Sequence, residues 1–385
     1  MRNIAIVAVG YNRPDCSKRL LESLGRAEYG NEIVDLIVSI DKGQKQLEIK
    51  EIADDFLWNH GQKIVIAHKE RKGLKQHILS CGEMTKKYEA VIVLEDDITV
   101  SRSFFYYTIN ALDYYKDNDE IAGISLYGFL FNPGVRRPFL PEKNEYDTYL
   151  MQVAQSWGQV WTRGMWESFF EWFSSHQDGI PDDGITPSYI SKWGEGSWLK
   201  YYDRYVAETN KFYVYPYTSL STNNSDVGEH CKYANNSYQV PLQAGIKKEY
   251  LFAPIEKAVK YDAFFERIGL IFKIYDIESN EILMDLMGGR TNYLEYNYLL
   301  SINLLPYKCI SSYRLCFRPI EVNCKNPTEG KDYFLYDLHE KATPPHNSMY
   351  GVTSYDIKDI HWKKTILHGM IGLWISIKRR LGIVK

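Results

Sequence analysis

The sequence predicts an α/β protein built on a doubly wound, mostly parallel sheet. Short apolar runs of strand length alternate with helix-length segments through the first third of the 385-residue chain. Such alternation is typical of β-α-β units, whose strands pair in parallel. The chain contains neither GxGxxG nor GxxxxGK[ST], which excludes a dinucleotide fingerprint and a phosphate-binding P-loop.

Four strands and three helices are expected in this third. Runs rich in Val, Ile and Leu predict strands at Ile4–Val9, Val34–Ile40, Lys63–Ala67 and Ala90–Leu94. Apolar residues at helical spacing predict helices at Cys16–Leu24, Leu47–Trp58 and Gly73–Tyr88.

Three consecutive carboxylates, Glu95, Asp96 and Asp97, follow the fourth strand. Adjacent acids repel one another, whereas Mg²⁺ or Mn²⁺ binds carboxylate oxygens and keeps coordination positions for phosphate. Ligands of open α/β sheets bind beyond the carboxyl ends of the strands. Taken alone, the triplet fits a metal-diphosphate site and a solvated acidic turn equally well.

Polar residues follow two further strands at the same sheet edge. Arg13 comes after the first strand, and Asp41 comes after the second. Arginine pairs well with phosphate, and aspartate accepts hydrogen bonds from a base or a ribose. The convergence of these residues on the triplet favours a nucleoside-diphosphate site.

The segments that carry these residues resemble the nucleotide-sugar half of GT-A-fold glycosyltransferases. The resemblance is to the N-acetylglucosaminyltransferase I family and its bacterial surface-polysaccharide relatives, and it weakens beyond the first 110 residues or so. It implies a GT-A-like sheet with Mn²⁺ or Mg²⁺ on Asp97. It also implies that Glu95 and Asp96 lie near the ribose and the metal's water shell, that Asp41 contacts a uracil, and that Arg13 contacts the nucleotide.

The segment 156–205 resembles the acceptor-side region of the same family, where an aromatic-rich helix carries a catalytic carboxylate. Counting back from Pro216, the family's aspartate falls near Leu199-Lys200, which cannot act as a base. The nearest acids are Asp203, on the expected helix, and Glu195, in a glycine-flanked loop. We rank Asp203 first and Glu195 second.

Both Asp203 and a histidine further along have simpler interpretations. A surface ion pair of Asp203 with Arg204 or a nearby lysine is an equally good explanation of that acid. His230 ends the polar loop Ser221–His230 and resembles the histidine with which many GT-A enzymes touch the metal or diphosphate. A lone histidine is more often structural.

Four parts of the chain are expected. They are a nucleotide-sugar-binding half at 1–128, an acceptor-side catalytic half at 129–245, a small α+β addition at 246–345 and a tail at 346–385. No motif identifies the addition.

Within the addition, the pattern predicts a loop followed by a helix in Phe252–Glu266. It predicts strands at Ile282–Met287, Leu315–Val322 and Tyr333–Tyr336.

The tail contains a basic amphipathic helix at residues 363–381. Its apolar residues recur at helical spacing, and lysine and arginine lie at both ends. Such a helix suits an interface with anionic lipid. A terminal helix docked on its own domain explains the pattern equally well.

The composition of the chain limits which partners and which cellular compartment are expected. A net charge of -3 gives no electrostatic case for nucleic acid. The six cysteines show neither CxxC nor zinc spacing, which is typical of free thiols in a reducing compartment. With no signal peptide and no run of 18 apolar residues, we expect a cytoplasmic protein, at the inner face of the cell membrane if the tail binds lipid.

The sequence thus predicts an inverting, metal-dependent glycosyltransferase. It would move a sugar from a nucleotide-diphosphate donor, a UDP-sugar by resemblance, to a hydroxyl of a saccharide or lipid-linked saccharide in bacterial surface polysaccharide synthesis. Two alternatives stay open: a sugar nucleotidyltransferase, and a non-catalytic sugar-binding scaffold with a degenerate GT-A fold.

Overall fold

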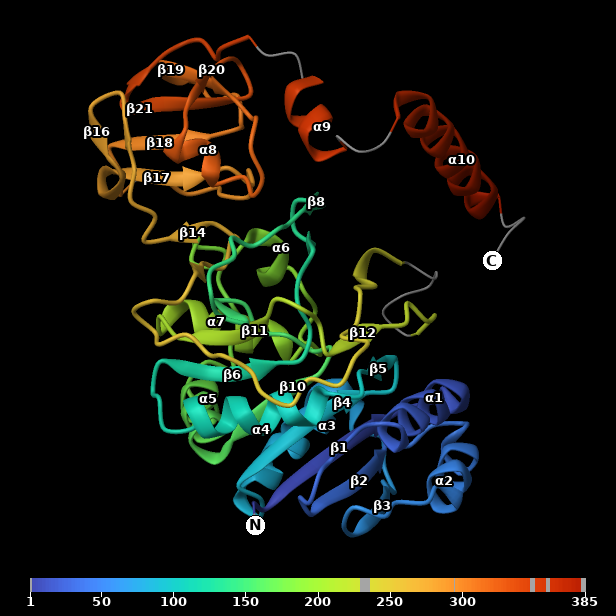
Figure 1. The fold of residues 1–385 in the computed structure, drawn as a ribbon. Helices are drawn as coiled ribbons and strands as arrows, with labels where there is room; N and C mark the ends of the chain where they lie inside the picture. The colour runs from blue at the N-terminus through green and yellow to red at the C-terminus, as the bar shows by residue number, and fades with distance from the viewer. Residues whose placement is uncertain (1, 229–235, 294, 347–349, 358–360, 382–385) are drawn as a thin grey trace. The chain divides into compact units, whose positions relative to one another are not determined.

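The computed structural model describes residues 2–228, 236–293, 295–346, 350–357 and 361–381 (Figure 1). The chain divides into two compact units. The first consists of Met1–Asp226, Asn235–Leu270 and Gly289–Asn292, and the second consists mainly of Ile271–Gly288 and Tyr293–Lys385. All candidate site residues that the structure describes belong to the first unit.

The N-terminal part of the first unit is the doubly wound parallel sheet that the alternation predicts. Its strands are β1 (Ile4–Gly10), β2 (Val34–Ile40), β3 (Lys63–Ala67) and β4 (Ala90–Glu95). They pair in parallel in the order β4-β1-β2-β3. The connecting helices are α1 (Pro14–Gly25), α2 (Gln46–Asp55) and α3 (Gly73–Gly82), which a 3-10 turn (Glu83–Lys86) extends.

Alternation along these strands decides which residues face which helices. Ile4, Ile6 and Ala8 of β1 pack in one cluster with α1 residues such as Leu20 and Leu24. The intervening residues of β1, β2 and β4 point to the opposite face, where α3 lies. The sheet is therefore covered on both sides, and its polar groups concentrate at the carboxyl ends of the strands.

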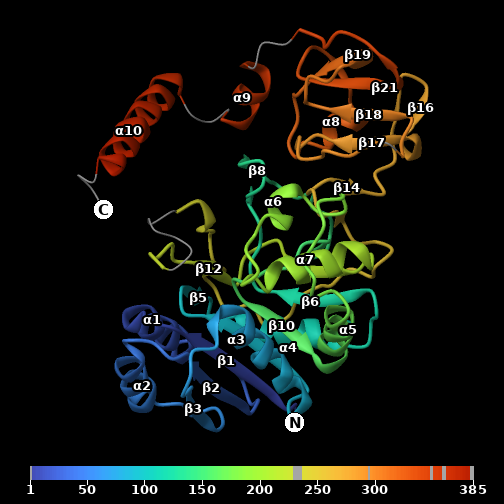
Figure 2. The same ribbon diagram turned by 180° about the vertical axis from the view of Figure 1, so that it is seen from behind.

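Six further strands continue the sheet through both parallel and antiparallel pairings, so the whole ten-stranded sheet is mixed, in the order β14-β13-β9-β11-β6-β10-β4-β1-β2-β3. Its further strands are β6 (Ile121–Ser125), β9 (Thr148–Met151), β10 (Gln159–Thr162), β11 (Phe212–Pro216), β13 (Lys260–Tyr261) and β14 (Arg267–Ile268). The helices of this part are α4 (Phe104–Tyr115), α5 (Arg163–Ser174), α6 (Ser188–Ser191) and α7 (Leu199–Glu208). Figure 2 shows α5 and α7 beside this half of the sheet.

Two short ribbons and a turn complete the first unit. One ribbon pairs β5 (Ile98–Val100) with β12 (Ser221–Asn223), and the other pairs β7 (Phe131–Asn132) with β8 (Arg137–Pro138). A 3-10 turn spans Asn236–Tyr238. The first ribbon matters for the site, because β5 begins directly after Asp97.

Much of the aromatic content is core. Trp161 of β10 stacks on Tyr202 of α7 and contacts Trp166 and Trp198, and all four side chains are buried. These rings pack α5 and α7 against the sheet.

The second unit contains a five-stranded sheet in the order β17-β18-β21-β19-β20. The five strands of this sheet are β17 (Ile282–Asp285), β18 (Tyr298–Ser301), β19 (Tyr307–Arg314), β20 (Thr328–Glu329) and β21 (Tyr333–Lys341). A separate two-stranded ribbon pairs β15 (Lys273–Ile274) with β16 (Ile277–Glu278). The helical elements are a 3-10 turn (Ser279–Glu281), α8 (Val322–Lys325), α9 (Tyr350–Asp356) and α10 (Trp362–Arg380).

Two predicted elements are wrong. The helix expected within Phe252–Glu266 is absent: this stretch forms turns and the short strand β13. The strand expected at Leu315–Val322 is absent: the stretch is irregular around Pro319 and ends in the first residue of α8, and the true strand is β19, immediately before it. Proline lacks the N–H that a ladder needs.

Helix α10 confirms the helical periodicity of the tail. Its apolar residues are exposed, among them Leu367 at 58%, Met370 at 64% and Trp374 at 58%. Among the described residues, no helix is long and apolar enough to span a bilayer.

Candidate functional site

The three acids after β4 face different surroundings. Glu95, the last residue of β4, lies on the α3 side, close enough to Cys81 to act on the pKa of that buried thiol. Asp96 is 4% exposed and accepts hydrogen bonds from the backbone N–H of Tyr11 at 3.3 Å and from the Arg13 guanidinium. Asp97 lies in the turn before β5.

Arg13 joins Asp96 to Asp97. Its guanidinium forms an ion pair with Asp96, and its Nη1 lies 3.5 Å from Oδ2 of Asp97. Burial disfavours the charged guanidinium, but attraction to Asp96 and then Asp97 outweighs burial and raises the pKa of Arg13. The first strand's arginine and the fourth strand's acids therefore meet, as their positions at one sheet edge predict.

Two of the three acids, Glu95 and Asp96, have pKa values above the usual range of a carboxyl group. Burial, followed by repulsion from Asp97 and Asp96, raises the pKa of Glu95 to about 8. Burial raises the pKa of Asp96 to about 6, although Arg13 opposes that shift. Crowded acids short of positive charge form the kind of site that a divalent cation stabilises.

Asp97 offers an oxygen that no described residue uses. Its Oδ1 is buried without a hydrogen-bond partner, whereas Oδ2 faces Arg13. An unpartnered buried carboxylate oxygen is costly. No group of three or more His, Cys, Asp or Glu able to hold a metal occurs in the described part of the chain. The unpartnered Oδ1 of Asp97 fits a cation held by one carboxylate and completed by phosphate and water, as Mg²⁺ commonly is.

Other buried polar atoms without partners lie on the elements around the triplet. They are Ser17 Oγ and Arg19 Nε on α1, Ser225 Oγ after β12, and side-chain atoms of Gln155, between β9 and β10, and of Gln159, at the start of β10. Gln159 pairs with Val93 in the ladder, two residues before Glu95 on the same face. Native interiors leave few such atoms unsatisfied, so a polar ligand at this edge would find hydrogen-bonding groups that are not already used.

Asp41 has a definite local role. Its Oδ1 accepts from the backbone N–H groups of Lys42 and Lys72, both at 2.8 Å, and its Oδ2 accepts from Gly73 at 2.9 Å. Burial opposes ionisation, but these hydrogen bonds outweigh it and lower the pKa of Asp41. The carboxylate thus fixes the start of α3 at the site's edge. Its contact with a uracil stays a prediction.

Asp203 is not part of a surface ion pair, so that interpretation is wrong. Its side chain is 3% exposed and accepts from the backbone N–H of Ala154 at 2.7 Å. Arg204 instead binds Asp183 and Glu208. Burial raises the pKa of Asp203 to about 8.

Ala154, which binds Asp203, belongs to the segment between β9 and β10. Five residues after Ala154, β10 starts antiparallel to the carboxyl end of β4.

Glu195 is a solvent-exposed acid whose side chain is 73% accessible. It accepts from Lys200 Nζ at 2.6 Å and from the Tyr201 hydroxyl at 2.8 Å. These two hydrogen bonds lower its pKa. A carboxylate held in this way is a weaker base than Asp203.

His230 lies outside the described residues. The polar loop that precedes it does reach the site: Asn223 of β12 pairs with Ile98 of β5, and Asn224 contacts the backbone of Asp97. The sequence marked this loop as polar but gave no signal that Asn224 would meet the triplet. The backbone contact of Tyr11 with Asp96 carried no signal either.

Comparisons with known proteins find similarity only among solved structures. No family model matches the chain, and no curated protein matches it. The mannosyltransferase PcManGT from Pyrobaculum calidifontis, in complex with GDP-Man and Mn²⁺, is 11% identical with a TM-score of 0.30, over 49% of this chain and 50% of that one.

Two further structures are similar to about the same degree. TarS 1–349 from S. aureus, in complex with UDP-GlcNAc, is 13% identical with a TM-score of 0.39, over 60% of this chain and 61% of that one. GalNAc-T7 with UDP, GalNAc and Mn²⁺ is 15% identical with a TM-score of 0.38, over 57% of this chain and 43% of that one. The chain thus spans between 43% and 61% of these three structures. A likeness of this size carries no argument about activity, so that argument rests on the site's geometry.

Proposed function

We propose that the protein is an inverting, metal-dependent glycosyltransferase that moves a sugar from a nucleoside-diphosphate donor, most simply a UDP-sugar, to a hydroxyl acceptor. The observation that carries the proposal is the buried, unpartnered Oδ1 of Asp97 beside the Arg13 guanidinium. An unsatisfied carboxylate oxygen and an arginine at one sheet edge supply what a metal-bound diphosphate needs.

In this proposal Asp97 holds Mn²⁺ or Mg²⁺, which would neutralise charge on the departing diphosphate. Arg13 adds a second positive charge there, because its guanidinium can turn from the acids towards a phosphate. Glu95 and Asp96 lie near the ribose and the metal's water shell, and Asp41 contacts the base. His230 is a further candidate for the metal or diphosphate.

Asp203 is the proposed base. A group that takes a proton from an acceptor hydroxyl works best with a pKa near the working pH, and the pKa of Asp203 is about 8. Its bond to Ala154 ties it to the segment that enters the triplet's edge. Glu195 stays the second candidate, since Lys200 and Tyr201 hold it and lower its pKa.

The proposed acceptor is a saccharide, free or lipid-linked, in bacterial surface polysaccharide synthesis at the cytoplasmic side of the membrane. The exposed apolar residues of α10 and its terminal lysines and arginines support a peripheral membrane contact. Lys378 lies over the Trp374 ring at 3.5 Å, a pairing that suits the lipid-water boundary.

Screening nucleotide sugars with Mn²⁺ tests the function. The transferase should be stabilised against heat by a donor with Mn²⁺ and should release nucleoside diphosphate as it transfers the sugar. Release of pyrophosphate from a nucleoside triphosphate and a sugar phosphate would identify a nucleotidyltransferase. Donor binding without turnover on any acceptor would identify a scaffold.

A further inference from the structure

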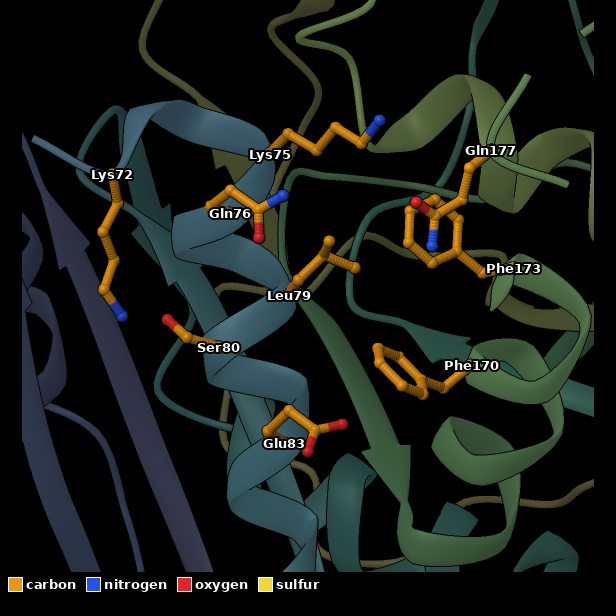
Figure 3. Close-up of a pocket in the computed structure, with 9 residues that line it drawn as sticks. All are labelled: Lys72, Lys75, Gln76, Leu79, Ser80, Glu83, Phe170, Phe173 and Gln177. Atoms are coloured by element: carbon orange, nitrogen blue, oxygen red, sulfur yellow. The ribbon is translucent and has the colours of Figure 1, made fainter. Parts of the chain in front are cut away.

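A groove lies over α3 on the face that α5 shares, away from the acid triplet's own contacts. Its volume is about 440 Å³, within the range of small-molecule sites. Residues of α3 and its ends form one wall, and Phe170, Phe173 and Gln177 form the other. Figure 3 shows Lys75 extending from α3 towards the end of α5, and Lys72 on the opposite side of α3.

The groove exists because α3 and α5 approach each other closely only at the end of the groove where α3 ends. At Gly82 an added Cβ would overlap the Trp166 ring, so α3 and α5 are in contact there. Trp166 donates to Glu83 Oε1 at 2.9 Å, and Lys86 also binds Glu83. The one acid in the lining is therefore already neutralised.

Lys75 is an ammonium short of partners. It lies over the Tyr201 ring at 4.2 Å and the Phe173 ring at 5.4 Å, and no carboxylate or hydrogen-bond acceptor of a described residue binds it. Burial lowers its pKa more than the attraction of nearby Glu195 raises it. Glu195 is itself occupied by Lys200 and Tyr201. An anion in the groove would give Lys75 the acceptor that it lacks.

The remaining groups suit a sugar. Phe170 is an aromatic ring with 37% of its surface exposed in the groove wall. The apolar face of a pyranose stacks on such a ring. The side chains of Gln76, Ser80 and Gln177 offer donors and acceptors for hydroxyl groups.

The groove begins at the edge that carries the candidate donor site. The backbone N–H groups of Lys72 and Gly73 bind Asp41, whereas the Lys72 side chain lines the groove. A saccharide bound over α3 can therefore extend towards the carboxyl ends of the strands.

We infer that this groove binds an acidic saccharide, whose carboxylate or phosphate meets Lys75 and whose ring stacks on Phe170. Assigning this saccharide as the acceptor rests on the proposed transferase function. If that function holds, the acceptor is an anionic glycan.

Direct binding without metal or nucleotide tests the groove apart from the donor site. The probes are a glucuronate-containing disaccharide, its neutral counterpart, glucose 6-phosphate and inorganic phosphate, followed by calorimetry or saturation-transfer NMR. The acidic disaccharide and the sugar phosphate should bind, and the neutral sugar and inorganic phosphate should bind at least about tenfold more weakly.

Variants locate the binding. Lys75→Gln should weaken acidic-saccharide binding about tenfold, and Phe170→Ala severalfold. Lys50→Gln, at an α2 lysine that pairs with Asp54, and Tyr114→Ala, at a half-exposed ring of α4, are the matched controls and should change nothing. Each variant's melting temperature shows whether it is folded.

Equal binding of acidic and neutral sugars, no binding of either acidic probe, or unchanged binding in Lys75→Gln and Phe170→Ala would overturn the inference. Binding of inorganic phosphate as tight as that of glucose 6-phosphate would also overturn the inference, because the groove would then recognise an anion and not a sugar. Donor binding with Mn²⁺ is measured on the same preparations. If the groove binds the acidic probes but the protein binds no donor with Mn²⁺, the proposed function is contradicted. If the protein binds donor with Mn²⁺ but the groove binds no acidic probe, the inference about the groove is contradicted.

Discussion

Asn224 donates two hydrogen bonds to the backbone carbonyl of Asp97, one from its own backbone N–H at 2.8 Å and one from its side-chain amide at 3.0 Å. The two residues are 127 positions apart. The β5–β12 ribbon brings them together, because Asn223 pairs with Ile98. Asn224 therefore positions the turn that carries the proposed metal ligand.

Asn224→Ala should weaken Mn²⁺-dependent binding of UDP about tenfold, since the side-chain bond is lost and the turn loosens. Calorimetry with Mn²⁺ measures the change. Asn326→Ala, which removes a similar side-chain bond to the Val322 carbonyl, is the control and should leave binding unchanged. Unaltered UDP binding in Asn224→Ala would mean that the loop does not position the site.

Asp203→Asn should lower turnover about a hundredfold or more while donor affinity stays within a few-fold, as expected when proton transfer alone is lost. Initial rates and donor titrations measure the two quantities. Full activity in Asp203→Asn with loss in Glu195→Gln would move the base to Glu195. Full activity in both variants would refute a carboxylate base on this segment.

The pKa of Asp203, raised by burial to about 8, makes a separate prediction about stability. An unfolded aspartate has a pKa of about 3.9, so between these values the folded state holds a proton that the unfolded state releases. The free energy of unfolding should fall as pH rises through this window, by at most about 1.4 kcal/mol per pH unit.

Asp203→Asn cannot lose that proton. The melting temperature of Asp203→Asn minus that of the wild type should therefore increase from pH 5 to pH 8. A difference that stays constant across this range would show that Asp203 is ionised in the folded protein.

Truncation before α10, at residue 360, should release the protein from anionic vesicles if the helix lies at the lipid interface. Binding of the full chain should weaken with salt, because part of the attraction is between lysine or arginine and the head groups. Trp374→Glu should act like the truncation, because it places a charge among the exposed apolar residues. Equal co-sedimentation of the full and truncated chains would contradict a membrane role, and a lower melting temperature on truncation would indicate a docked helix.

The sequence predicts the N-terminal half of the fold well, because local signals and packing agree there. The range of β2 is the expected Val34–Ile40, and that of β3 is the expected Lys63–Ala67. Parallel pairing then forces Arg13 and the acid triplet to one edge, so their proximity follows from topology alone.

The predictions fail where tertiary contacts, and not the local sequence, determine the secondary structure or the burial of a residue. The sequence of β19 looks polar because it contains Lys308, Ser311, Ser312 and Arg314, yet its ladder with β21 makes it a strand. Asp203 lies between Tyr202 and Arg204, and the sequence does not reveal that the acid is buried while the arginine reaches two other acids. The groove over α3 depends on the approach of α5, which no local pattern encodes.

The most direct test of the account is calorimetry of UDP with and without Mn²⁺, for the wild type and Asp97→Asn. The account predicts that Mn²⁺ strengthens UDP binding to the wild type, and that Asp97→Asn abolishes this gain while melting at the wild-type temperature or above it, since one of three crowded acids is gone. An equal Mn²⁺-dependent gain in both proteins would contradict the account.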